Sequence, residues 1–245
     1  MEELEKNLWR KIDYYLKFLR FVPFLRMVAV CNNLAFGRVN KHSDIDLFIV
    51  ARAGRLFMVR TFVTCILHVL GVRRHGKKVA GRFCLSFFVD DSRLNLERIA
   101  LNQDVYLAYW IKSLQPILDD GVSREFFAKN GWIERYLSDE RLLARFHSTL
   151  KFGKAQGFFE RILDGGFGNF IEKILKKWQL KRAGKKLLLA GEKSSLIVDE
   201  HILKFHNLDR RKLFRNYWFK VYGKDQKVDS GRFMNLAKEI LENKD

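Results

Sequence analysis

The sequence is poor in proline, cysteine and acidic residues, and each shortage excludes a class of protein. Only 2 of its 245 residues are proline and 16 are glycine, which excludes collagen-like and linker-rich chains. Its 3 cysteines, Cys31, Cys65 and Cys84, form no Cys-x-x-Cys pair, so we expect buried free thiols in a reducing compartment. The 28 acidic residues face 46 basic ones, and the net charge of +18 predicts a polyanionic partner: a nucleotide, a nucleic acid or an anionic membrane surface.

Long hydrophobic runs are also missing. The longest apolar stretch, residues 56–72, is interrupted by Arg60 and His68 and falls short of the about 20 apolar residues that a membrane-spanning helix needs. It predicts a buried helix and no membrane span. The acidic start at Met1-Glu2-Glu3 lacks the apolar segment of a secretory signal, so we expect a cytoplasmic protein.

Apolar residues nevertheless make up 48% of the chain and include 22 Phe, enough for a sizeable core. Strand patterns at 26–31, 44–50 and 82–90, with helix patterns at 4–19 and 53–70, predict an α/β domain. Helix patterns then follow at 103–118, 122–136, 138–151, 155–163, 170–182, 209–222 and 230–243, with a break at Gly165-Gly166-Phe167-Gly168 and a short strand or extended piece at 196–198. We therefore expect an α+β protein, with an α/β domain over residues 1–93 and a basic, mostly helical domain over residues 94–245.

Two carboxylates lie on the clearest strand, Ser43-Asp44-Ile45-Asp46-Leu47-Phe48-Ile49-Val50. Because side chains alternate along a strand, Asp44 and Asp46 face the same way, about 6.6 Å apart along the backbone. Such a pair can share divalent cations, as two-metal phosphoryl-transfer sites require. Two solvent-facing aspartates at a strand start are the structural alternative.

The stretch over residues 28–47 resembles the polymerase-β-type nucleotidyltransferase superfamily. In that family a hydrophobic strand leads to a Gly-Ser pair, and an Asp-x-Asp motif follows about ten residues later on the next strand; here ten residues separate Asn33 from Asp44. The likeness is closest to uncharacterised bacterial proteins that add a basic helical C-terminal region. It extends to Gly54-Arg55-Leu56-Phe57 and to Phe205-His206…Asp209-Arg210-Arg211.

This resemblance implies a polymerase-β-like fold in which Asp44 and Asp46 hold Mg²⁺ or Mn²⁺ and an NTP is the substrate. Asn32-Asn33 replaces the family's Gly-Ser pair and would contact the triphosphate. Arg38 and Lys41, in the loop before the aspartates, could neutralise the triphosphate or be solvated loop charges. Asparagine tolerates positive φ and can donate a side-chain hydrogen bond, which would preserve the turn.

The family's third carboxylate usually lies on a neighbouring strand. Alternation over residues 82–90 puts Asp90 in phase with Cys84 and Ser86, so Asp90 is the predicted third catalytic and metal-binding carboxylate. If Ser86 holds that position instead, one metal ligand or general base is missing, and the protein binds nucleotide without turning it over.

Two functions follow from the resemblance. The first is a metal-dependent nucleotidyltransferase that moves a nucleoside monophosphate from an NTP to an RNA end, a protein side chain or a small molecule. The second is a catalytically degenerate domain whose basic helical half binds nucleic acid or a partner protein. Residues 141–245 hold 24 basic and 12 acidic residues, so we expect a polyanion to dock on this half, with a solvated basic face as the alternative.

Two further basic segments have two interpretations each. The cluster at Arg73, Arg74, His75, Lys77 and Lys78 could grip phosphate or form an exposed connector. Residues 210–220 alternate cations with aromatic rings, which suits base stacking, but Phe214 and Trp218 at helical spacing favour the core face of an amphipathic helix.

Overall fold

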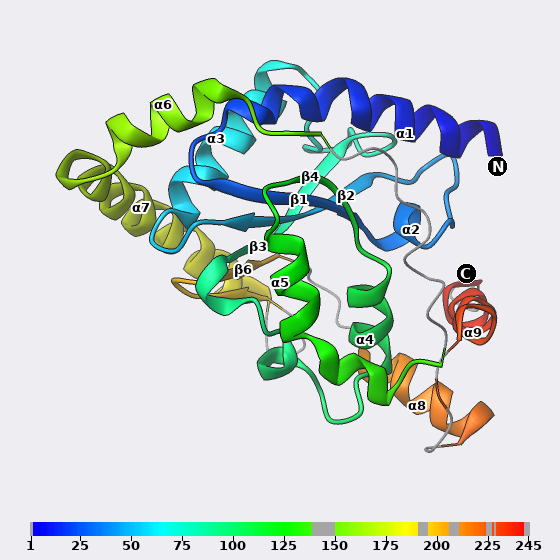
Figure 1. Cartoon of the computed structure of the whole chain (residues 1–245). Coiled ribbons are helices and arrows are strands. Elements are labelled where there is room, and N and C mark those ends of the chain that lie inside the picture. Colours follow the sequence, from blue (N-terminus) through cyan, green and yellow to red (C-terminus); the bar gives the residue numbers. More distant parts are fainter. Residues whose placement is uncertain are drawn as a thin grey trace.

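The computed structural model has one six-stranded sheet with helices on both of its faces (Figure 1). It describes residues 2–138, 150–190, 196–205, 211–223, 227 and 229–242. The helices are α1 (Glu2–Leu16), α2 (Asn32–Ala35), α3 (Leu56–Val69), α4 (Val105–Lys112), α5 (Val122–Lys129), α6 (Lys154–Leu163), α7 (Gly166–Ala190), α8 (Arg211–Tyr222) and α9 (Ser230–Glu242), and 3-10 helices cover Lys17–Phe21, Asp91–Arg93, Glu97–Ile99 and Gly131–Arg135. The strands are β1 (Leu25–Cys31), β2 (Ile45–Ala51), β3 (Phe83–Asp90), β4 (Gln115–Asp119), β5 (Ile197–Val198) and β6 (Ile202–Lys204).

The sheet is mixed, and its strand order is β4-β1-β2-β3-β6-β5. Strand β1 runs antiparallel to β2, and β2 runs parallel to β3. The parallel pair needs a crossover, which α3 supplies. The predicted α+β class is confirmed, and so are the three strands and the crossover helix predicted before residue 91.

The region after residue 93 differs from its prediction, because it contributes strands to this same sheet. Strand β4 pairs with β1, and β6 pairs with β3, so the sheet crosses the boundary expected at residue 93. The helix predicted over 103–118 was wrong in its second half: α4 ends at Lys112 and β4 begins at Gln115. Pro116 accounts for this change, since proline interrupts a helix but fits an edge strand.

Smaller departures occur in the helical region. The helix predicted over 122–136 is divided at Asn130, where α5 gives way to a 3-10 helix. The break predicted at residues 165–168 is confirmed in position within about two residues, since α6 ends at Leu163 and α7 begins at Gly166. Most of the helix predicted over 138–151 lies outside the described residues, as do His206, Asp209 and Arg210.

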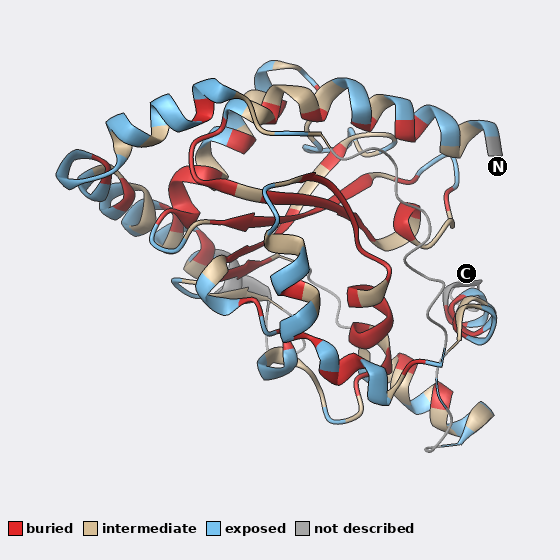
Figure 2. Ribbon diagram, viewed as in Figure 1, coloured by how far each residue is buried: buried red, intermediate tan, exposed pale blue. Residues whose placement is uncertain are grey.

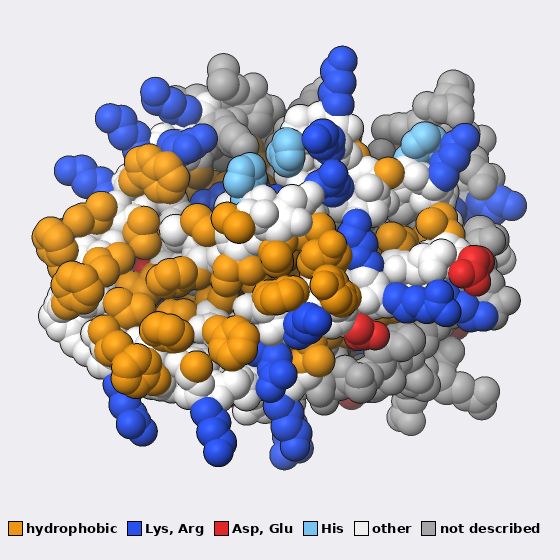
Figure 3. Space-filling view, turned by 90° about the horizontal axis from the view of Figure 1, so that it is seen from above, with side chains coloured by type: hydrophobic (Ala, Val, Ile, Leu, Met, Phe, Trp, Pro, Cys, Tyr) orange, Lys and Arg blue, Asp and Glu red, His pale blue; other side chains and the backbone are white. Residues whose placement is uncertain are grey.

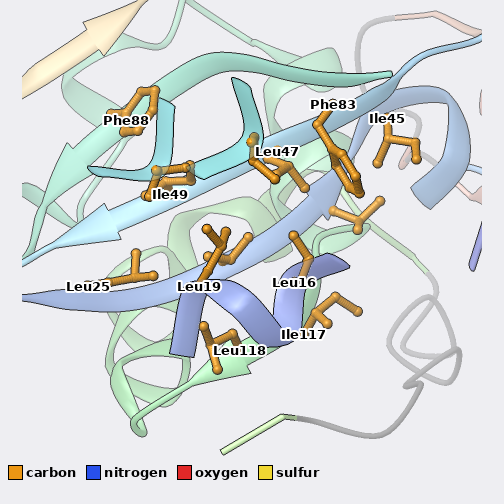
Figure 4. Close-up of a cluster of buried hydrophobic side chains, with 14 of the residues drawn as sticks. Leu16, Leu19, Leu25, Ile45, Leu47, Ile49, Phe83, Phe88, Ile117 and Leu118 are labelled. Carbon is orange, nitrogen blue, oxygen red and sulfur yellow. The ribbon is translucent and has the colours of Figure 1, made fainter. Parts of the chain in front are cut away.

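The sheet has an apolar core on each face, and burial concentrates on its strands (Figure 2). On one face, α1 and α3 pack over alternate strand residues such as Ile45, Leu47 and Ile49. Figure 4 shows these side chains meeting Leu16 and Leu19 from the N-terminal helices. Strand β2 is buried on both faces, and its sequence is accordingly a continuous apolar run after Asp46.

The second core lies on the opposite face, under α4, α5, α8 and α9, and is rich in aromatic rings. Phe48 and Phe87 contact Trp110 with ring centroids 5.4 Å apart in each pair. Phe214 and Trp218 are both buried here, which confirms the core interpretation of the aromatic residues in α8. Among the residues that the structure describes, none of the helices is long and apolar enough to cross a membrane.

Candidate functional site

The candidate site lies at the edge of the sheet where β1 ends and β2 begins. Because β1 and β2 are antiparallel, Cys31 pairs with Asp46 across the ladder. Because β2 and β3 are parallel, Cys84 pairs with Asp46 from the other side. The central strand therefore presents its carboxylates between two neighbouring strands, in a rigid setting.

Asp44, Asp46 and Cys84 form a compact set of donor atoms. One carboxylate oxygen from each aspartate and the Cys84 sulfur all lie within 4.8 Å of one another. Asp46 is buried, and Asp44 is partly exposed at the rim. The predicted in-phase arrangement of the two aspartates is confirmed, and the arrangement fits a single cation with an open side toward solvent.

Arg74 is the positive charge nearest this set. Its Nη1 donates to Asp44 Oδ2 at 2.6 Å and lies 3.7 Å from Cys84 Sγ. The backbone N–H of Arg74 donates to Phe83 O, which fixes the connector beside β3. Of the predicted basic cluster over residues 73–78, Arg74 is thus brought into the site.

Close packing of the two carboxylates carries an electrostatic cost. Burial, and then the Asp44 charge, raise the pKa of Asp46 to about 6, although hydrogen bonds from Asn32 and Cys84 act in the opposite direction. Burial, and then the Asp46 and Asp44 charges, raise the pKa of the Cys84 thiol to about 12. A bound cation would reverse both effects, because it favours the ionised forms.

Asn32 forms the turn after β1 and hydrogen-bonds two residues of the site. Its φ of 57° confirms that the turn after β1 requires positive φ, which asparagine tolerates. Its Oδ1 accepts a hydrogen bond from Trp110 Nε1 at 2.8 Å, and its side chain also hydrogen-bonds Asp46. The Asn32 amide therefore links α4 to the buried carboxylate and orients Asp46.

The other predicted phosphate-binding residues lie around the loop between α2 and β2. Asn33 is half-buried in α2, and its carbonyl accepts from Arg38 N at 2.7 Å. The Nη1 atom of Arg38 is buried and has no hydrogen-bond partner in the described structure. Lys41 is exposed in the turn that Asn40 and Ser43 close. An anionic ligand would satisfy the unpaired Arg38 donor.

Asp90 does not join the site, so its prediction as the third carboxylate is corrected. The pairing of β2 with β3 skips Ser86, because Leu47 pairs with Leu85 and Phe48 with Phe87. This bulge reverses the alternation, so Phe87 enters the second core. Phe88 enters the first core (Figure 4). Asp90 therefore lies on the opposite face from Asp46.

Asp90 also lies at the far end of β3. It pairs with Ala51, whereas Asp46 pairs with Cys84, and six residues of strand span roughly 20 Å. Asp90 accepts hydrogen bonds from Ser92 N at 3.1 Å and Ser92 Oγ at 2.6 Å, and its Oδ2 lies 2.8 Å from His201 Nδ1. Asp91 is at the same end, where it accepts from Ala53 N at 2.8 Å.

Sequence reasoning missed two contributors, Cys84 and Trp110. Cys84 occupies the position beside Asp46 that the third carboxylate was expected to hold. Its place in phase with Ser86 was visible, but the bulge that separates it from Asp90 has no local signal. Trp110 is 78 positions from Asn32, and only the packing of α4 brings them together.

Comparison with known proteins finds no matching family model, no similar curated protein and no similar solved structure.

Proposed function

We propose that this chain is a nucleotidyltransferase-like protein that binds a nucleoside triphosphate together with a divalent cation at Asp44 and Asp46. The observation that carries the proposal is the cluster of two carboxylates and one thiol, with donor atoms within 4.8 Å of one another. Carboxylates held this close repel each other, and Arg74 neutralises only part of their charge. A divalent cation would remove the remaining repulsion.

The donor set is compatible with the cations expected from the sequence. Mg²⁺ is commonly bound by one or two carboxylates together with substrate phosphates, which matches Asp44 and Asp46. Mn²⁺ also accepts oxygen ligands, and the Cys84 sulfur adds a softer ligand. When bound, such a cation would neutralise phosphate charge and fix the phosphate oxygens in place.

A nucleotide is favoured over a bare cation by the loop beside the carboxylates. This loop carries the Asn-Asn pair of the family resemblance, and it leaves a buried Arg38 nitrogen without a partner in the described structure. Arginine is well suited to phosphate because it offers several donors in a planar array. The proposal includes the polymerase-β-like arrangement of the β1, β2 and β3 strands.

Nucleotidyl transfer is the second candidate function. The Asp-x-Asp pair on β2 supports it, whereas the replacement of the third carboxylate by Cys84 favours binding without turnover. An acceptor, if there is one, would be a nucleic acid or a protein that the basic C-terminal region attracts.

Calorimetry with each NTP, with and without Mg²⁺ or Mn²⁺, tests the binding proposal. We expect binding that needs the cation and is lost in Asp44→Asn/Asp46→Asn. The exposed pair Asp13→Asn/Glu134→Gln changes net charge equally and should bind normally. The proposal fails if the wild-type protein binds no NTP, or if the double variant binds as well as the wild type.

Transfer is tested separately by incubating α-labelled NTPs and the cation with cellular RNA and protein extract. Label that becomes covalently attached, and is lost in Asp44→Asn/Asp46→Asn, would establish transfer at this site. Cation-dependent binding without such label would establish the binding module instead.

A further inference from the structure

Helix α7 has apolar residues on two faces, and within the described residues only one of these faces packs against the protein. On the inner face, Ile171 and Leu175 contact the first core. Glu172 accepts from the backbone N–H groups of Phe57 and Met58, at 2.9 and 2.8 Å. These contacts attach α7 to the start of α3.

The outer face of α7 carries an exposed apolar stripe. Phe167, Phe170, Ile174 and Trp178 are each at least half exposed, and their spacing places them on one side of the helix. A surface helix normally turns its polar face to water. This stripe is therefore available to a partner.

The neighbouring helix α6 extends this apolar surface. Phe158 and Ile162 are more than half exposed, and Phe159 is 43% exposed. Helix α6 packs against α7, and the two form a hairpin at one end of the molecule (Figure 1). These exposed apolar residues of α6 and α7 are called the aromatic face below. The view from above in Figure 3 shows a broad patch of apolar side chains with Lys and Arg side chains at its edge.

The charge around the aromatic face is strongly positive. Residues 154–185 contain eight Lys or Arg and three Asp or Glu. All three acids are engaged within the protein: Glu160 accepts from Phe24 N, Asp164 pairs with Arg52, and Glu172 holds α3. The remaining surface charge is therefore almost entirely basic.

The cations lie beside the apolar stripe. Exposed Lys173, Lys177 and Lys181 repeat every four residues, so they form a row along one flank of it. The Arg182 guanidinium lies 5.2 Å from the Trp178 ring centroid. Aromatic rings beside long cationic side chains suit a bilayer interface, where rings enter the headgroup region and cations reach the phosphates.

We infer that the aromatic face docks on the surface of an anionic lipid bilayer, without spanning it. A second copy of this chain is a poor occupant, because it would bring two rows of lysines face to face. An anionic bilayer offers both an apolar layer for the rings and negative charge for the lysines.

Vesicle flotation tests the inference with the full chain. Protein should float with phosphatidylcholine vesicles that contain phosphatidylglycerol and much less with phosphatidylcholine alone. Phe167→Gln/Phe170→Gln should lower the bound fraction about tenfold, because binding scales with buried apolar area. Val221→Gln, which removes an exposed apolar side chain from the outer side of α8, is the control and should not change it.

A second pair of variants tests the contribution of the lysine charges to vesicle binding. Lys173→Gln/Lys177→Gln should weaken binding to the anionic vesicles about tenfold, since each surface cation adds to attraction by anionic lipids. Lys212→Gln/Lys220→Gln, exposed on α8, removes the same charge elsewhere and should change binding little.

The fluorescence of Trp178 reports how deeply the aromatic face inserts into the bilayer. It is 52% exposed, whereas Trp9, Trp110, Trp132 and Trp218 are buried. Vesicles should therefore shift the fluorescence to shorter wavelength, and brominated lipid should quench it. The inference is overturned if anionic vesicles bind no protein or leave Trp178 unquenched, or if the Phe variant floats like the wild type. A dimer in sedimentation equilibrium that the Phe variant abolishes would also overturn it, in favour of a second copy.

Discussion

A buried carboxylate lies at each end of β3: Asp46, from the neighbouring strand β2, at one end and Asp90 at the other. The environments of these two carboxylates differ. At one end Asp46 lies against Asp44 and Cys84, and its pKa is raised to about 6. At the other end Asp90 receives two hydrogen bonds from Ser92 and contacts His201. Asp90 has its partners within the protein and stabilises the fold, whereas Asp44 and Asp46 repel each other despite their contacts with Arg74 and Asn32, which suits this pair to a cation.

The largest expected effect comes from Asp90→Ala. Removing this fully buried carboxylate leaves the Ser92 donors and His201 without their partner. We expect the free energy of unfolding to fall by about 2–4 kcal/mol, measured by urea denaturation. Cation binding by the folded variant should match the wild type; a folded variant that has lost it would place Asp90 in the site after all.

The second prediction concerns Asp46→Asn and depends on pH. The folded-state pKa of about 6 lies above the unfolded value, so ionised Asp46 costs stability above pH 6 and the cost vanishes below about pH 4. Asp46→Asn should therefore raise the free energy of unfolding by up to about 3 kcal/mol at pH 8 and hardly at all at pH 4.

Thermal denaturation across this pH range measures the effect. Mn²⁺ should stabilise the wild type more than the variant, because the variant has lost a ligand. Destabilisation by Asp46→Asn at pH 8 would contradict the proposed repulsion.

A third prediction separates the sulfur ligand from the carboxylates. Cys84→Ser should weaken Mn²⁺ and Zn²⁺ binding about tenfold, or about 1.4 kcal/mol, and change Mg²⁺ binding little. Calorimetry with the three cations provides the comparison. Cys65→Ser, an exposed thiol elsewhere, is the control; equal losses for all three cations would mean that Cys84 acts only through packing.

The smallest expected effect comes from Arg74→Gln. Arg74 lowers the pKa of Asp46, so its removal should move that pKa above about 6. Because the Arg74 side chain is 45% exposed, the loss of stability at neutral pH should be only about 0.5–1 kcal/mol. Carboxyl NMR titration measures the pKa, with Arg73→Gln as the control. An unchanged pKa in Arg74→Gln would contradict the ion pair.

Much of the first half of the chain could be predicted from local pattern. The alternation around Asp44 and Asp46, the helix over 53–70 and the strand before Asp91 all depend on neighbours in the sequence. Strand β4 could not be found in the same way, because its apolar residues also fit the helical period of α4. Pro116 is the one local signal against a helix there.

In the candidate site, too, some features follow from local sequence pattern and others depend on tertiary contacts. The sequence alone determined that two carboxylates share a strand face and that Asn32 tolerates a turn with positive φ, since both follow from backbone geometry. Tertiary structure decided what lies beside them. The bulge at Ser86 moved Asp90 to the other face, and strand pairing placed Cys84 next to Asp46. Packing also brought in Arg74 and Trp110, because contacts between distant segments are set by pairing register rather than by local pattern.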